Sequence, residues 1–350
     1  MILFLSKYPQ TDADFRDGFF QRVASIDEFY LKDERIYLNT SLFGNKKKEV
    51  IKTALRTEIS CNFFLHFLTI YKIFRRSELI YIQSIYNAFY NIFFIIFFSK
   101  NYILDLHGVV PEELEMKNKT VHALIASKIE GILFKKIRVC ISVTNKMAIH
   151  YQSKYPNSQC KYIVYAILPT HLKGGNLSNE SLDKSDKIEI IYSGNTQVWQ
   201  NVDLMLQAIK SNSSKQVNYT ILTGEPEKIY EKLNDFKIED STVTVKSVKP
   251  NELAEYYKKS HYGFILRDDI LVNRVACPTK IIEYLAYGIK PIILSEKIGD
   301  FEDYGYEYIF LEQLNDGLSK QKSIKNIQII KEILLNNQFN LKSKILNNLK

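Results

Sequence analysis

Short β-rich runs alternate with longer amphipathic segments along most of the chain, and this alternation predicts parallel strands joined by crossover helices. Between the strands, apolar residues recur at helical spacing from Val121 to Leu133, with lysines largely between them. In the first half the predicted strands are Ile2–Ser6, Arg35–Leu38, Leu79–Gln83, Tyr102–Leu106, Val139–Val143 and Tyr162–Tyr165.

Residues 169–187, PTHLKGGNLSNESLDKSDK, interrupt this alternation because they are rich in Gly, Ser, Asn and charge and have no periodicity. The alternation then restarts. The strands predicted after the interruption are Ile188–Ser193, Tyr219–Thr223, Val243–Lys246, Gly263–Leu266 and Pro291–Leu294. The predicted helices are Val202–Lys210, Lys228–Leu233, Glu252–Lys258, Lys280–Ala286 and a Lys/Asn-rich tail from Ile324 to Leu349.

The length of 350 residues also favours two domains over one. We therefore expect a first domain at 1–170, a linker at 171–187, a second domain at 188–325 and a helical tail at 326–350. In such α/β domains the carboxyl ends of the strands carry the ligand site. A cleft between the domains is expected there.

Charge is distributed unevenly. Residues 1–170 contain 23 Lys/Arg and 15 Asp/Glu, whereas residues 171–350 contain 24 of each. Anionic lipid, a phosphate-bearing acceptor or nucleic acid could account for the basic half, and so could neutral drift in lysine usage. The run Tyr86–Phe98, YNAFYNIFFIIFF, is too short to cross a bilayer and predicts a buried helix or an interfacial patch.

The remaining candidate chemistry is limited. The four cysteines show no ligand or disulfide spacing, which fits a reducing compartment, and MILFLSKYPQ lacks the features of a signal peptide. Asp12-Ala-Asp14 is a DxD triplet but lies so near the first strand that a solvated loop is the better interpretation. There is no Walker A loop, GxGxxG fingerprint or Ser/His/Asp signature, so kinase, dehydrogenase and serine hydrolase functions lose support.

The most informative segment is GFILRDDILVNRVACPTKIIEYLAYGIKPIIL, residues 263–294. A strand ends at Arg267, a polar loop follows, and Pro278-Thr279 stands where a helix should begin, with threonine able to cap the first amides. Free amides and the positive end of the helix dipole form an anion site. Lys280 can neutralise a phosphate there, and the Glu283 carboxylate can accept hydrogen bonds from two ribose hydroxyls.

This segment resembles the donor-binding region of retaining GT-B glycosyltransferases of glycosyltransferase family 4, which often act in bacterial polysaccharide assembly. The family's pattern is a carboxylate followed by Ala-x-Gly-x-Pro. It corresponds here to Glu283, Ala286, Gly288 and, displaced by one residue, Pro291. Ile191-Tyr-Ser-Gly194, Ile221-Leu-Thr-Gly224 and Leu104-Asp-Leu-His-Gly108 are similar to other strand ends of that family.

The resemblance implies an α/β protein of GT-B fold, with two Rossmann-like domains facing a central cleft. It implies catalytic roles for His107, Arg267 and Lys280, with His107 facing the sugar or the acceptor. It implies a donor site in which the amides near Thr279 hold the diphosphate and Val248 lies against the base. The donor-binding residues expected in full are Gly18, Gly194, Asn195, Val248, Asn273, Arg274, Thr279 and Glu283.

The sequence differs from the family at two positions where the family has a cationic side chain. The family has an arginine after the Gly194 position and a lysine six residues later, where this chain has Asn195 and Asn201. Arg267, Lys280 and Arg274 must then supply the charge. The family usually has another glutamate eight residues before the position of Glu283. Val275 stands there in this chain, and Asp268 or Asp269 is the nearest carboxylate that could substitute.

We therefore expect an enzyme that moves a sugar from a nucleotide-diphosphate sugar to a glycan or lipid-linked glycan acceptor, with retention and without a metal or other cofactor. The resemblance suggests bacterial surface polysaccharide, such as O-antigen or capsule. The alternatives are a GT-B-fold sugar-nucleotide epimerase and a non-catalytic sugar-nucleotide- or glycan-binding protein. A nucleic-acid partner is not expected, because basic charge without a recognition motif is its only support. The expected location is cytoplasmic, with peripheral binding to the anionic inner face of the membrane.

Overall fold

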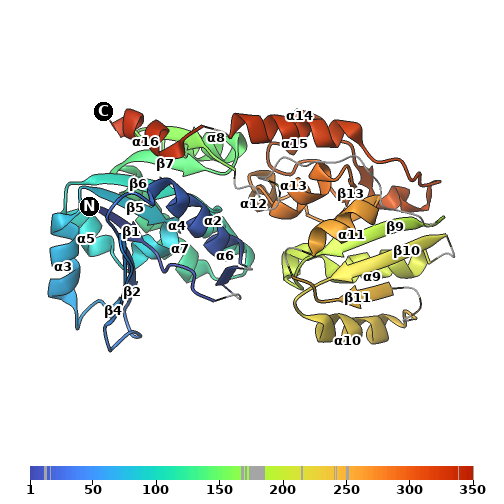
Figure 1. Cartoon of the computed structure of the whole chain (residues 1–350), viewed down its shortest axis with the longest axis horizontal. Coiled ribbons are helices and arrows are strands. Elements are labelled where there is room, and N and C mark those ends of the chain that lie inside the picture. The colour runs from blue at the N-terminus through green and yellow to red at the C-terminus, as the bar shows by residue number, and fades with distance from the viewer. Residues whose placement is uncertain are drawn as a thin grey trace. The chain divides into compact units, whose positions relative to one another are not determined.

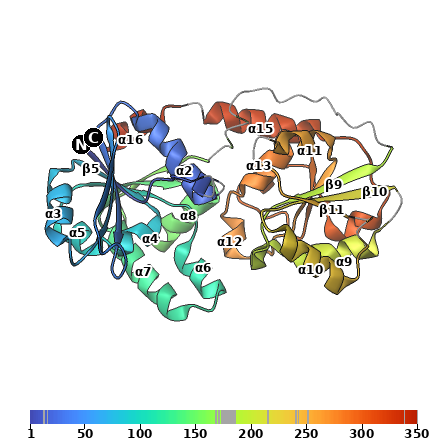
Figure 2. The same cartoon turned by 60° about the horizontal axis from the view of Figure 1, so that its bottom comes forward.

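The computed structural model describes residues 1–11, 14–15, 17–166, 169, 172, 186–213, 216–239, 241, 243–249, 252–337 and 339–349. The chain forms two compact units (Figures 1 and 2). Unit 1 comprises Met1–Ile167 and Phe339–Lys350, and unit 2 comprises Leu168–Gln338. Most of the expected linker at 171–187 lies outside the described residues.

The sheet of unit 1 has eight strands in the order β3-β4-β2-β1-β5-β6-β7-β8. All neighbouring pairs are parallel except β3 with β4. The strand bounds are β1 Ile2–Leu5, β2 Arg35–Ser41, β3 Glu49–Lys52, β4 Arg56–Asn62, β5 Leu79–Gln83, β6 Asn101–Asp105, β7 Ile137–Ser142 and β8 Lys161–Val164. The central strands are buried on both faces, which explains their nearly continuous apolar sequences.

One face of this sheet is covered by α2 (Gly18–Asp27), the short helix η1 (Glu28–Tyr30) and α16 (Leu341–Leu349). Val23 and Ile26 of α2 share a buried cluster with Leu341 and Ile345 of α16. The expected helical tail is thus divided, because α15 (Ile324–Asn336) packs on α13 (Thr279–Ala286) in unit 2. Each of the two helices buries its own apolar side in a different core.

Right-handed crossovers place the helices that follow β4, β5, β6 and β7 on the other face of the sheet. Their bounds are α3 Phe67–Arg76, α4 Ser84–Phe89, α5 Ile92–Phe97, α6 Val110–Met116, α7 Thr120–Phe134 and α8 Asn145–Lys154. The apolar run 86–98 therefore forms parts of two short helices separated around the buried Asn91. None of the helices within the described ranges has both the length and the apolar content needed to cross a bilayer.

The sheet of unit 2 has six strands in the order β11-β10-β9-β12-β13-β14, and every neighbouring pair is parallel. The bounds are β9 Ile188–Ser193, β10 Val217–Leu222, β11 Val243–Lys246, β12 Tyr262–Ile265, β13 Lys290–Ile293 and β14 Ile309–Phe310. Helices α9 (Val202–Ser211) and α10 (Pro226–Phe236) cover one face, while α11 (Leu253–Lys259), α13 and α15 cover the other (Figure 2). The switch in connection direction falls between β9 and β12, which is where such sheets bind ligands.

Candidate functional site

The strand ends of unit 2 bring the expected donor residues to one edge of its sheet. Gly194 and Asn195 follow β9, Val248 follows β11 and Arg267 follows β12. Helix α13 runs back along the sheet from the same edge, so Thr279 and Lys280 in its first turn begin there.

Helix α13 begins as expected at Pro278-Thr279, but Pro278 occupies the N-cap position and no side chain caps the helix. The expectation that Thr279 caps the first amides is wrong, because Thr279 is itself the first helical residue. The helix ends at Ala286, and Gly288, two residues further on, has a φ of 67°, the left-handed conformation that glycine adopts most easily. An amino terminus without a side-chain cap leaves backbone N–H groups available to an anion.

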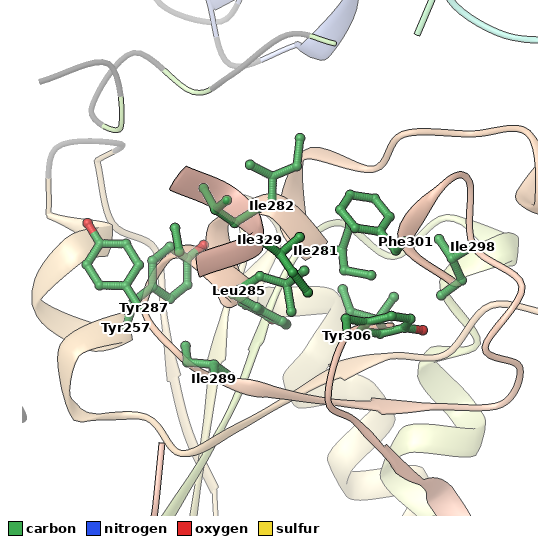
Figure 3. Packing of buried hydrophobic residues seen from close by; sticks show 14 of the residues in the cluster. Tyr257, Ile281, Ile282, Leu285, Tyr287, Ile289, Ile298, Phe301, Tyr306 and Ile329 are labelled. Atoms are coloured by element: carbon green, nitrogen blue, oxygen red, sulfur yellow. The ribbon is translucent and has the colours of Figure 1, made fainter. Parts of the chain in front are cut away.

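The position of α13 is fixed by an apolar cluster between it, α11 and α15. Figure 3 shows the buried side chains Ile281, Ile282 and Leu285 of α13 beside Ile329 of α15. The other labelled members of the cluster are Tyr257, Tyr287, Ile289, Ile298, Phe301 and Tyr306. Val248 packs against this cluster as a partly buried residue. A helix packed on several sides holds its amino terminus in place.

A chain of hydroxyl hydrogen bonds joins α13 to strand β9 and helix α11. The backbone N–H of Ser193 donates to Tyr284 Oη at 3.0 Å, and the Ser193 and Tyr257 hydroxyls are 2.7 Å apart. Tyr257 Oη then donates to Glu283 Oε2 at 2.9 Å. Lys280 Nζ donates to the same oxygen at 3.0 Å. Glu283 is therefore held in a defined position by both contacts at one oxygen.

Arg267 is a half-buried cation at the end of β12. Its Nη1 donates to Asn273 Oδ1 at 3.3 Å, and Asn273 is buried and also donates to the carbonyl of Asp268. Burial lowers the pKa of Arg267 below its usual range. Within the described ranges no carboxylate pairs with this guanidinium. A cation placed in this way favours an anionic ligand.

Arg274 lies in a different environment, although it is only seven residues further on. Its Nε is 2.5 Å from Asp269 Oδ1, and Lys297 Nζ lies 3.5 Å from the other oxygen of that carboxylate. Arg274 is exposed and its charge is already paired. The structure therefore brings Arg267 and Asn273 together and leaves Arg274 in a separate surface pair.

The two asparagines at the family's cation positions have structural contacts. Asn201 adopts a left-handed conformation with a φ of 49°, which asparagine tolerates better than most residues. Its side-chain N–H groups donate to Leu266 O and Asp268 Oδ2, both at 3.1 Å, and so anchor the loop that carries Arg267. Asn195 accepts at its backbone carbonyl from Tyr192 Oη at 2.5 Å. Gly194 is needed beside it, because a Cβ there would lie 2.6 Å from that hydroxyl.

In unit 1, His107 follows β6 at the carboxyl edge of the sheet. Its Nε2 lies 2.7 Å from Gln83 Oε1, and its ring contacts Phe19 at a centroid distance of 4.6 Å. Burial lowers the pKa of His107 to about 3, more than the nearby Asp105 carboxylate raises it. The imidazole is therefore neutral near neutral pH. With Nε2–H donating to Gln83, Nδ1 is the ring's acceptor.

A buried ion pair below His107 was not expected from the sequence. Arg22 of α2 binds Asp105 at the end of β6, with its Nη2 2.6 Å and its Nε 2.7 Å from Oδ1. Tyr81 Oη donates to the other carboxylate oxygen at 2.8 Å. An aspartate within an apolar strand was the available signal, because a buried carboxylate requires partners of this kind.

Gly18 is the first residue of α2, and the side chain of Asp17 caps this helix by accepting from Phe19 N–H at 2.7 Å. A Cβ at Gly18 would meet no atom within 4 Å, so packing does not require glycine at this position. In the DxD triplet, Asp12 lies outside the described residues, and Asp14 accepts from the backbone of Gln10 and Thr11 and pairs with Lys7. The described part of the chain contains no group of three or more His, Cys, Asp or Glu arranged to hold a metal ion.

No protein-family model matches the sequence, and no curated protein does. Solved structures match the whole chain. Sucrose-phosphate synthase from Thermosynechococcus elongatus aligns with a TM-score of 0.63 at 13% identity, covering 99% of this chain and 96% of that one. HepE from Anabaena, in complex with UDP and glucose, aligns with a TM-score of 0.66 at 11% identity, covering 99% of each chain. Trehalose-6-phosphate synthase OtsA aligns with a TM-score of 0.64 at 10% identity, covering 99% and 98%.

These neighbours are GT-B glycosyltransferases, and their likeness extends over both units. The chain therefore has the GT-B fold, with two Rossmann-like units, as the resemblance implied. Identities of 10–13% show the fold alone.

Proposed function

We propose that the chain is a glycosyltransferase that transfers a sugar from a UDP-sugar, bound by unit 2, to a glycan or lipid-linked glycan acceptor. The observation that carries the proposal is the half-buried Arg267 without a carboxylate partner among the described residues, on the sheet edge where α13 begins. The choice of UDP is supported by HepE, whose structures contain UDP and UDP-glucose.

In this proposal, Arg267 and the first amides of α13 stabilise the charge that develops on the departing diphosphate. A fixed cation and oriented N–H groups contribute most when they need no rearrangement during the reaction. Arg267 is positioned by Asn273, and α13 by the cluster around Ile281. Glu283 binds the ribose hydroxyls, and Lys280 orients this carboxylate and adds positive charge near the phosphates.

The catalytic role proposed for His107 follows from its neutral state. A neutral imidazole can accept a hydrogen bond from a sugar or acceptor hydroxyl at Nδ1 while Gln83 fixes the ring. Retention of configuration is proposed from the family resemblance, with the leaving phosphate taking the acceptor proton. The charge of Arg267 and Lys280 would then serve in place of a metal ion.

A second candidate is a non-catalytic sugar-nucleotide-binding protein. It is favoured by Asn195 and Asn201, which stand where the family has an arginine and a lysine. Asn201 is committed to hydrogen bonds with the Arg267 loop, so the substitution is integrated into the fold. Release of UDP from a UDP-sugar in the presence of an acceptor distinguishes the transferase from the binding protein.

The proposal is tested by calorimetric titration of UDP, GDP and dTDP in the presence of EDTA, followed by a UDP-release assay. We expect UDP to bind, and the substitution Arg267→Gln to weaken binding by about 1.5–3 kcal/mol through loss of charged hydrogen bonds. We also expect kcat to fall by about a hundredfold, as it does when one donor to a developing anion is removed.

Arg138→Gln is the matched control, because Arg138 is exposed on β7 in unit 1 and none of the proposed contacts involves it. Unchanged UDP affinity in Arg267→Gln would contradict the donor site. An absolute need for a divalent cation would contradict the metal-free part alone. Binding of UDP without its release from any UDP-sugar tested would favour the non-catalytic candidate.

A further inference from the structure

The surface formed by α3, the residues just before it and α5 in unit 1 carries large apolar side chains that the described chain leaves largely exposed. Phe64, Leu65, Leu68 and Phe97 are each exposed by 65–71%, and Phe93 and Ile96 are also exposed. We call these six residues the α3–α5 face. Exposed apolar surface on this scale usually marks a binding site.

The two helices lie side by side (Figures 1 and 2) and are joined by a layer of rings beneath this face. Phe67 of α3 contacts Phe93 and Phe94 of α5, at centroid distances of 5.6 and 4.9 Å. Phe74 contacts Phe94 at 5.1 Å. The inner rings Phe67, Phe74 and Phe94 form the core between the helices. The six outer residues, of which Phe93 also touches Phe67, form a second apolar layer above them.

Positive charge adjoins the apolar layer. On α3, Leu68, Lys72 and Arg75 are spaced at four and three residues, so they share one side of the helix. Lys72, Arg75 and the adjacent Arg76 are all exposed. Residues 63–104 contain four basic side chains and one acidic side chain, Glu78. Exposed apolar side chains therefore gather at the start of α3 and along α5, and exposed cations adjoin them at the end of α3.

We propose that the α3–α5 face binds the surface of an anionic lipid bilayer. Apolar side chains at this position can enter the boundary between headgroups and acyl chains, while arginine and lysine contact lipid phosphates. A second copy of the same face offers no acidic complement to its own charge, because Glu78 is the one acidic residue in 63–104. An anionic bilayer supplies both the apolar interior and the negative charge that the face lacks.

The orientation of the helices gives this surface a relation to the candidate site of unit 1. Helix α3 follows β4 and so begins near the carboxyl edge of the sheet. Phe93 near the start of α5 contacts Phe67 at the start of α3, so α5 begins at the same level. His107 follows β6 at that edge. A lipid-linked acceptor held at the bilayer would therefore reach unit 1 at the edge that carries His107. This last relation rests on the proposed function, whereas bilayer binding itself does not.

The test is co-sedimentation of the whole chain with vesicles of equimolar phosphatidylglycerol and phosphatidylcholine, and with vesicles of phosphatidylcholine alone. Three variants are compared with the unchanged chain. The apolar variant is Phe64→Ser/Leu68→Ser/Phe97→Ser, and the charge variant is Arg75→Glu/Arg76→Glu. The charge control is Lys210→Glu/Lys331→Glu, which makes the same change in net charge at two exposed helical positions of unit 2.

We expect the unchanged chain to bind the anionic vesicles more tightly than the neutral ones, and less tightly at high salt. The charge variant and the apolar variant should each bind at least about tenfold more weakly, and the control should bind as the unchanged chain does. Circular dichroism checks that each variant is folded, which the exposure of all five substituted residues in the first two variants favours.

The proposal is overturned if the unchanged chain does not bind anionic vesicles, or if the control loses as much affinity as the charge variant. It is also overturned if light scattering shows a dimer that the apolar variant dissociates, because the face would then be an interface between copies. The assay contains neither donor nor acceptor. Its failure is therefore distinguishable from failure of the proposed transferase activity, which UDP release measures separately.

Discussion

His107 has the properties of a hydrogen-bonding group that stays neutral. Its ring is packed on Phe19 and linked to Gln83, and burial opposes protonation more strongly than Asp105 favours it. Arg22 adds positive charge nearby while it neutralises Asp105. The residue is therefore suited to orient a hydroxyl over a wide pH range, and a protonated imidazole does not form at moderately acidic pH.

The lowered pKa makes the stability of the native state depend on pH. The ordinary histidine pKa is 6.5, whereas His107 has a pKa of about 3 in the folded chain. Between these values the unfolded chain binds a proton that the native chain does not, so acidification destabilises the fold by up to about 1.4 kcal/mol per pH unit. His107→Gln removes this contribution. Urea unfolding of both chains at several pH values should give a shallower acid dependence for the variant, and equal slopes would contradict the assignment.

At this scale the sequence indicated where the candidate site residues lie in the fold better than it indicated what they contact. The resemblance led to His107, Arg267 and Glu283, each of which lies on or beside the carboxyl edge of its sheet. It could not indicate that Arg274 pairs with Asp269, because that contact depends on the path of the loop between them. The hydrogen bond from Tyr257 to Glu283 was equally inaccessible, since the residues are 26 positions apart.

At the scale of elements, a glycine in β12 allows α13 to pack closely against that strand. A Cβ at Gly263 of β12 would lie 2.4 Å from Cε2 of Tyr284, a ring of α13 that is fully buried. Tyr284 in turn accepts the hydrogen bond from the backbone of Ser193. The absence of a side chain at Gly263 thus sets how closely α13 approaches the sheet, and with it the place where α13 begins.

The substitution Gly263→Ala should therefore destabilise unit 2 by about 1–3 kcal/mol through overpacking. It should also weaken UDP binding, because α13 must move to accommodate the methyl group. Gly224→Ala is the matched control, since a Cβ there would meet no atom within 4 Å. Thermal unfolding and UDP titration of both variants measure the effect. Equal stability of the two alanine variants would show that Tyr284 moves aside without cost.

Strands with strong apolar patterns were predicted closely, whereas the polar or exposed strands β3 and β4 were not. Strands β5, β9 and β11 have the predicted bounds, and the other predicted strands differ by a few residues at most. Strand β3 was not predicted because all four of its residues are exposed, so no apolar pattern marks it. Strand β4 has Arg56, Glu58 and Asn62 among its residues, and such a polar strand is recognisable only through its pairing with β2.

At the scale of the whole molecule, unit 1 is built from two separate parts of the sequence. The segment that begins at Phe339 returns to unit 1 after all of unit 2, and α16 completes the core over β7. Tyr165 contacts Phe339, and Lys342 forms an ion pair with Asp33. The periodicity that predicted a helical tail could not show which core would receive it, because both α15 and α16 have one apolar side.

We expect α16 to contribute to the stability of unit 1 through its two fully buried residues, Leu341 and Ile345. Leu341→Ala should cost about 2–5 kcal/mol, as the loss of a buried leucine side chain does elsewhere. Leu346→Ala, in the same helix but 42% exposed, is the matched control. Urea unfolding followed by circular dichroism measures both. A loss of stability in the control as large as in Leu341→Ala would mean that helix propensity, and not core packing, carries the effect.

Because α16 belongs to unit 1 but follows unit 2 in the sequence, the ribosome finishes unit 2 before it finishes unit 1. Unit 2 has all of its residues before Leu341 is translated, whereas the sheet of unit 1 has α2 and η1 on one face but still lacks α16 there. Phe4, Tyr37 and Val139 belong to the cluster on that face. The nascent chain therefore exposes apolar surface of unit 1 until α16 has been translated, and a fragment cut between the units would retain that exposure permanently.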